Sequence, residues 1–241
     1  MVPTDTPEAQ LAALRLQLSE LAEPDYAAFH SKLVPGNSRP ILGVRVPVLR
    51  KIARDLAKRP DWRYLFAALL APESYEEQIL CGLLLGYACR DYDEFETLVA
   101  QFQPVADNWA VCDICCNTFT IVARHSERAW PFLTAYLQSR DEMAQRFGIV
   151  MLMSHYRSPE DLPRVLEAYT MTTPRGYYAE MGMAWALSVL ILYIPQLVVD
   201  MLRIDCWSLK VRRMTCQKIL ESRRISDDWR TVVTNLRRRI R

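Results

Sequence analysis

The sequence has few of the residues and patterns that mark several common classes of protein. It contains 7 glycines in 241 residues, and no stretch shows the alternating polarity of exposed strands, which favours helices throughout. It carries no Walker-type phosphate loop and no glycine-rich dinucleotide motif. No segment reaches the roughly 18 uncharged apolar residues of a membrane span. The N-terminus lacks the basic and apolar regions of a secretory signal, so we expect none.

Metal and thiol chemistry are also poorly supported. The 7 cysteines are irregularly spaced, and several lie in apolar helical runs. On a helix, Cys112 and Cys116 would share a face with Cys115 close by, but no second cysteine pair or nearby histidine completes four ligands. The 3 histidines are scattered, which also disfavours a cysteine–histidine nucleophile. We therefore predict no metal, no cofactor, and free thiols in a reducing cytoplasm.

Charge is distributed unevenly along the chain. Residues 39–63 carry eight bases and two acids, a net charge of +6, whereas residues 64–113 carry one base and nine acids, a net charge of −8. Residues 203–241 carry twelve bases and four acids, a net charge of +8. Two basic blocks of this kind indicate a polyanionic partner such as nucleic acid, although solvated helix faces alone could produce them.

Helix signals follow one another with short links and no convincing strand. Predicted starts are Thr6, Ser74, Ser126 and Asp141, with either Asp107 or Asn108 before Trp109. Long helices are expected over 177–194, 204–222 and 226–240. Roughly fourteen helices, paired about every 30 to 40 residues, are typical of tetratricopeptide or HEAT arrays. Because no tetratricopeptide signature is present, we predict one all-α domain over residues 1–241, a HEAT-like α-solenoid.

The segment Asn108 to Asp113 is the first candidate for chemistry. Trp109 and Asp113 are four residues apart and would share a helix face, offering an aromatic plane and a carboxylate to a cation. The alternative is that Trp109 anchors the core and Asp113 is an ordinary acid. Arg146 and Trp185 lie in apolar helical runs, where a structural ion pair and core packing are the corresponding alternatives.

Five segments together resemble a known family. They are GVRVPVLRK (43–51), NWAVCD (108–113), Arg146 in its apolar helix, Tyr177-Tyr178 followed by AWAL (184–187), and QKILESRR (217–224). In this order they resemble the AlkD-like DNA alkylation repair enzymes, over about residues 26–230. The resemblance implies a HEAT-like superhelix whose concave basic face holds duplex DNA. It also implies a monofunctional glycosylase that hydrolyses the glycosidic bond of N-alkylated purines in DNA and so releases bases such as 3-methyladenine and 7-methylguanine.

The resemblance also implies roles for individual residues. Asp113 is similar to the catalytic carboxylate, Trp109 and Trp185 to the aromatic pair at the lesion, and Arg146 to an arginine at the backbone phosphate. Phe29 is similar to an aromatic near the lesion, with Tyr26 as the alternative. We predict further DNA contacts from the two basic blocks, through Arg45, Arg50, Lys51, Arg212, Lys218, Arg223 and Arg224.

The chain departs from the family pattern at two places. After AWAL, members often continue with Arg-Glu, whereas this chain has Ser188-Val189. The loop from Pro35 to Pro40 is longer than a minimal version. The prediction is a monomeric DNA repair glycosylase acting on duplex DNA. The alternative is a catalytically inactive helical scaffold that binds DNA or a protein.

Overall fold

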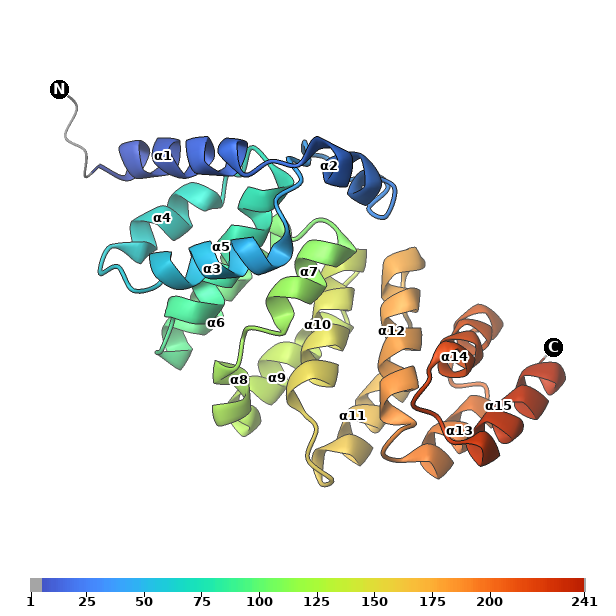
Figure 1. Ribbon diagram of the computed structural model, residues 1–241. Helices are drawn as coiled ribbons and strands as arrows, with labels where there is room; N and C mark the ends of the chain where they lie inside the picture. The colour runs from blue at the N-terminus through green and yellow to red at the C-terminus, as the bar shows by residue number, and fades with distance from the viewer. Residues whose placement is uncertain (1–5, 241) are drawn as a thin grey trace. The chain divides into compact units, whose positions relative to one another are not determined.

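The computed structural model describes residues 6–240, and all regular secondary structure in this part of the chain is helical (Figure 1). It contains fifteen α-helices, one short 3-10 helix and no strand. The all-α prediction is therefore confirmed. The chain divides into two compact units, residues 1–122 and 123–241. The single domain over residues 1–241 and the superhelical repeat stay predictions.

The first unit is built from seven α-helices. They are α1 (Pro7–Glu20), α2 (Pro24–Ser31), α3 (Val46–Leu56), α4 (Trp62–Leu69), α5 (Tyr75–Ala88), α6 (Tyr92–Phe102) and α7 (Trp109–Cys116), with the 3-10 helix η1 (Gln103–Val105) between the last two. The short helix α8 (Ile121–Arg124) spans the boundary between the units.

Helix α5 is the centre of the first unit. It contacts α3, α4, α6 and α7, and its residues from Tyr75 to Leu85 are all buried. An apolar sequence on all sides is what such a position requires. Helix α7 approaches α5 closely at Gly82. A Cβ placed on this glycine would lie only 2.5 Å from the Cys115 sulfur. Glycine at position 82 therefore sets the spacing of α5 and α7.

A buried carboxylate fixes the chain before α3. Glu76 is 1% exposed, and its oxygens accept the backbone N–H groups of Leu42 (3.0 Å), Gly43 (2.7 Å) and Val44 (3.2 Å). Such bonds satisfy a charge that would otherwise be costly to bury. Gly43 has a φ of +95°, and a Cβ there would overlap the carbonyl oxygen of Glu23. The glycine of the GVRVP segment is therefore a backbone requirement.

The second unit is built from seven further helices. They are α9 (Ser126–Leu137), α10 (Glu142–His155), α11 (Asp161–Thr170), α12 (Gly176–Leu190), α13 (Pro195–Arg203), α14 (Leu209–Glu221) and α15 (Asp227–Arg239). Helix α10 contacts α9, α11 and α12, and α12 contacts α14. Helices α10 and α12 are the most apolar parts of this unit, and their buried residues form its core.

Most predicted helix starts are confirmed, and the differences have local causes. The side chains of Thr6, Ser74, Asn108 and Asp141 accept N–H groups of the first turns that they cap. Ser126 was expected to be a cap but is the first helical residue, preceded by His125 at the cap position. The helix expected over 177–194 ends at Leu190, because a turn leads to Pro195. The one expected over 204–222 begins at Leu209, where Ser208 provides the cap.

Candidate active site

Helix α7 carries the tryptophan and the aspartate in the first unit. Asn108 accepts the N–H of Val111 (3.1 Å), which makes Trp109 the first helical residue. The Trp109 indole nitrogen donates to the carbonyl oxygen of Leu33 at 3.1 Å, so the ring is held at one edge. Trp109 and Asp113 are both half-buried. Because they are one helical turn apart, the ring and the carboxylate lie on the same side of α7.

A polar cluster ties the loop at 35–40 to the start of α7. One carboxylate oxygen of Asp107 accepts from Arg39 (2.7 Å) and Ser38 (2.8 Å). The other accepts from Gln78 (2.8 Å) and Asn108 (3.1 Å). Burial opposes ionisation, but these donors and the Arg39 charge together lower the pKa of Asp107 below its ordinary value. We call these five residues the Asp107 cluster; sequence reasoning considered Asp107 only as a possible cap.

The cysteines of α7 lie on its buried side. Cys112 and Cys116 have their sulfurs 3.9 Å apart, and the thiol of Cys115 donates to the carbonyl oxygen of Ile79 at 3.6 Å. Burial raises the pKa of Cys115 and Cys116 well above that of an ordinary thiol. Within residues 6–240, no group of three or more potential metal ligands comes together. The thiols therefore act as small packing side chains.

Helix α10 holds the first turn of α12 through two charged side chains. Arg146 is 4% exposed, and its Nη1 donates to the carbonyl oxygen of Tyr178 at 2.7 Å. Glu142, one turn earlier, accepts the N–H of the same Tyr178. Arg146 also lies along Gly182, where a Cβ would be 3.3 Å from its Cγ. No sequence signal distinguished Glu142 from other acids in first turns.

Trp185 is half-buried on α12, one face of which packs on α10. Ser188, on the same helix, is 8% exposed. Its hydroxyl donates to the carbonyl oxygen of Trp185 at 2.7 Å, within the helix. The side chain at position 188 therefore bonds to its own helix.

The aromatic residues predicted on α2 lie at the surface of the first unit. Phe29 is 57% exposed, whereas Tyr26 is half-buried. The guanidinium of Arg45 lies 4.6 Å from the centre of the Tyr26 ring and forms an ion pair with Glu23 at 2.9 Å. None of the α2 residues is buried, but only Phe29 offers its ring openly to solvent.

The predicted cationic residues fall into two groups. Two of them serve the fold: Arg50 donates to the Tyr87 hydroxyl (3.0 Å) and the Ile114 carbonyl (3.3 Å). Arg212 is 8% exposed and donates to the carbonyl of Leu202 at 2.9 Å. The second group lies at the surface. Lys51, Arg223 and Arg224 are exposed, and Lys218 bonds Glu221 at 3.2 Å.

The structure thus brings Trp109 and Asp113 together on α7 of the first unit. It also brings Arg146 and Trp185 onto the neighbouring helices α10 and α12 of the second unit. Convergence of all four residues on one surface stays a prediction. The arrangement on α7 offers a half-buried carboxylate beside an aromatic ring, a combination suited to stabilising a cation.

Comparison with known proteins shows the family of the chain. Residues 14–191, well over half of the chain, match the family model of the DNA alkylation repair enzyme. The chain therefore belongs to the DNA alkylation repair enzyme family. A search of curated proteins returned no match. In the described part of the chain, every helix is too short or too polar to cross a bilayer.

Proposed function

We propose that the protein is a monofunctional DNA glycosylase that removes cationic N-alkylated purines, such as 3-methyladenine and 7-methylguanine, from duplex DNA. The observation that carries this proposal is the Trp109–Asp113 pair on α7, in a chain that belongs to a DNA alkylation repair family. Asp113 is the proposed catalytic carboxylate, and Trp109 and Trp185 are the proposed aromatic contacts of the lesion nucleotide.

The chemistry needs little more than a carboxylate and aromatic faces. An N3- or N7-alkylated purine is already a cation, so its glycosidic bond can break without a general acid. The bonding electrons leave with the base, which becomes neutral, and positive charge develops on the deoxyribose. A carboxylate about 3–4 Å away stabilises this charge. Water then adds to C1′ and releases one proton. Each indole face that lies against the sugar cation stabilises it by about 0.5–2 kcal/mol.

Exposed side chains support part of the proposed DNA contacts. Lys51, Arg223 and Arg224 are exposed and enter the proposal as phosphate contacts. Arg45 and Lys218 would exchange the carboxylates of Glu23 and Glu221 for phosphate. Phe29, at 57% exposure, is the proposed aromatic contact near the lesion.

Three of the predicted DNA-binding arginines also bond other parts of the protein. Arg50 and Arg212 bond backbone carbonyls, and their contacts with phosphate stay predictions. Arg146 is 4% exposed and bonds the first turn of α12. We therefore propose that Arg146 positions the helix that carries Trp185.

We also propose that the helices form HEAT-like repeats whose concave basic face holds the duplex. Sequential neighbours pack against one another, as in α4 with α5, α9 with α10 and α14 with α15, which supports this arrangement. We also propose that the protein is a monomer in a reducing cytoplasm; the free and largely buried thiols support the reducing compartment.

Release of 7-methylguanine from methylated duplex DNA tests the proposal. Under single-turnover conditions, Asp113→Asn should slow release by at least about 100-fold, since removal of one stabilising group costs about 10²–10³ in rate. Asp93→Asn, which changes an exposed acid on α6 of the same unit, is the matched control and should keep the wild-type rate. Unmodified adenine should stay in the DNA.

The same assay decides against the proposal if the wild type releases no base at high enzyme concentration. Salt-dependent binding of the duplex without any release would then favour the non-catalytic scaffold. If Asp113→Asn kept full activity, the assignment of the carboxylate would be wrong even though the enzyme is a glycosylase.

A further inference from the structure

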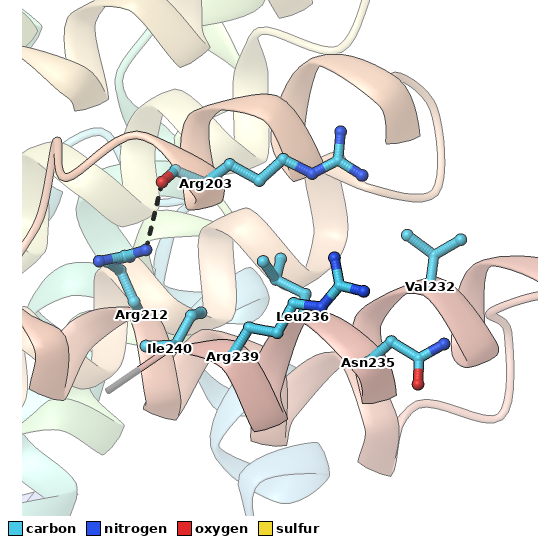
Figure 2. Close-up of a pocket in the computed structure, with 7 residues that line it drawn as sticks. All are labelled: Arg203, Arg212, Val232, Asn235, Leu236, Arg239 and Ile240. Atoms are coloured by element: carbon cyan, nitrogen blue, oxygen red, sulfur yellow. Dashed lines mark hydrogen bonds between the residues drawn. The ribbon is translucent and has the colours of Figure 1, made fainter.

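A cavity of about 410 Å³ lies in the second unit, lined by residues of α13, α14 and α15 (Figure 2). We call it the C-terminal cavity. All of its lining residues follow position 191, where the match to the family model ends. None belongs to α10 or α12, the helices that carry Arg146 and Trp185. It is therefore distinct from the residues proposed above for catalysis.

The polar wall of the C-terminal cavity is made by three arginines and an amide. Arg212 is fixed within the fold, because it donates to the carbonyl oxygens of Leu202 (2.9 Å) and Arg203 (3.4 Å). Arg203 and Arg239 approach from the ends of α13 and α15, and their side chains extend in a similar direction in Figure 2. Asn235 adds an amide from α15.

The apolar wall comes from α15 and the residue that follows it. Val232 and Leu236, one turn apart on α15, line the cavity together with Ile240 at the helix C-cap. Leu236 and Ile240 are buried, at 8% and 4% exposure. The cavity thus combines guanidinium groups with a small aliphatic surface, as needed for a phosphate attached to a sugar.

The charges around the cavity favour an anion. Its lining includes three arginines and no acid. Asp205 pairs with Arg212, and Asp200 pairs with Arg203 at 2.8 Å. The Asp200 pair is open to solvent, with side-chain exposures of 53% and 42%, and such a pair contributes little stability. Arg203 can therefore turn from Asp200 to an incoming anion at little cost.

We propose that the C-terminal cavity binds a backbone phosphate of nucleic acid, with Arg203 and Arg239 as its ligands. Guanidinium groups bind phosphate oxygens in pairs, Asn235 supplies a neutral donor, and the aliphatic wall faces the deoxyribose. The segment that contains the cavity, residues 203–241, carries a net charge of +8. This inference rests on the proposed function for its partner, DNA, and adds a contact beyond the catalytic residues.

Binding of undamaged DNA tests the inference without any need for catalysis. The dissociation constant of a 5′-labelled, unmodified 21-base-pair duplex is measured by fluorescence anisotropy at several salt concentrations. The test variant is Arg203→Gln/Arg239→Gln. The matched control is Arg140→Gln/Arg238→Gln, which also removes two exposed positive charges of the second unit but none from the cavity lining.

The test variant should bind about 10-fold more weakly at 0.1 M salt, and its salt slope should become shallower by about 1, since one phosphate contact contributes about 0.9. The control should weaken binding less than 3-fold. Equal losses in the two variants would assign the effect to general charge and overturn the inference. Unchanged affinity of the test variant would also overturn it, even if the wild type released 7-methylguanine as proposed.

A second arm separates a DNA phosphate from free phosphate. The melting temperature of the protein is measured at increasing concentrations of sodium phosphate, with the ionic strength held constant. A stabilisation of the wild type by sub-millimolar phosphate, absent from Arg203→Gln/Arg239→Gln and accompanied by unchanged DNA affinity, would assign the cavity to a small phosphate ligand. That result would overturn the assignment to DNA.

Discussion

The Asp107 cluster should stabilise both the loop at 35–40 and the start of the helix that presents Trp109 and Asp113. Asp107→Asn tests this most directly. It keeps the oxygen that faces Gln78 but places an amide NH₂ against the guanidinium of Arg39, where an ionised oxygen now accepts at 2.7 Å. The change therefore removes the charged half of the cluster and keeps its shape.

The size of the effect follows from exposure. A hydrogen bond to a charged group contributes about 1.5–3 kcal/mol when protected from water, and an exposed ion pair about 0–1 kcal/mol. The side chains of Arg39 and Asp107 are 29% and 33% exposed, between these limits. Asp107→Asn should thus lower the free energy of unfolding by about 1–2 kcal/mol. Arg39→Gln should cost a similar amount, and the two changes should couple by about 1 kcal/mol.

The assay is urea unfolding monitored by circular dichroism at pH 7, with Glu167→Gln, a change of an exposed acid inside α11, as the control for loss of a surface charge. Because the pKa of Asp107 is lowered in the fold, its contribution is present above its ordinary value of 3.8 and is lost as the pH falls through the folded pKa. The difference between wild type and Asp107→Asn should shrink under acid conditions. Additive effects of Asp107→Asn and Arg39→Gln, or a loss below about 0.3 kcal/mol, would refute the reasoning.

Three further predictions concern single residues. Gly43→Ala should lower the free energy of unfolding in urea by at least about 2 kcal/mol, because a Cβ would overlap the Glu23 carbonyl. Gly36→Ala, at φ +80° in open space, should lower it by only about 1 kcal/mol. Equal losses in the two variants would contradict this reasoning. Burial lowers the pKa of His30, so stability should fall as pH drops below 6.5; an unchanged slope in His30→Gln counts against it. A chromogenic disulfide reagent should label Cys206 rapidly and the six buried thiols only after unfolding; rapid labelling of several native thiols would disprove this.

The sequence predicted the helices well because their signals are local. Ser74, Asn108 and Asp141 cap helices as expected, since capping depends on residues within one turn. The run from Ile79 to Leu85 is apolar on all sides, a local pattern that fits its complete burial in α5. The boundary at Ser126 was wrong by one residue because His125 takes the cap position, and local signals define helix ends less sharply than helix centres.

The roles of the charged residues could not be predicted in the same way. Arg50, in the basic block of residues 39–63, looked like a surface cation but bonds the carbonyl of Ile114, 64 residues away in the chain. Arg212 lies beside Arg213, and only tertiary packing makes one buried and the other exposed. Glu142 became notable only when it proved to accept the N–H of Tyr178 on another helix. Such contacts depend on long-range geometry that composition and periodicity do not encode.

The buried thiols have a consequence for a protein of this family. Thiolates are the form of cysteine that attacks electrophiles, and alkylating agents that damage DNA are electrophiles. Six of the seven cysteines are buried, and burial raises the pKa of Cys89 and Cys216 to about 11. These two side chains are therefore almost entirely protonated at neutral pH, and the other buried thiols are sterically shielded. We therefore expect the buried thiols to resist alkylation by the electrophiles that damage DNA.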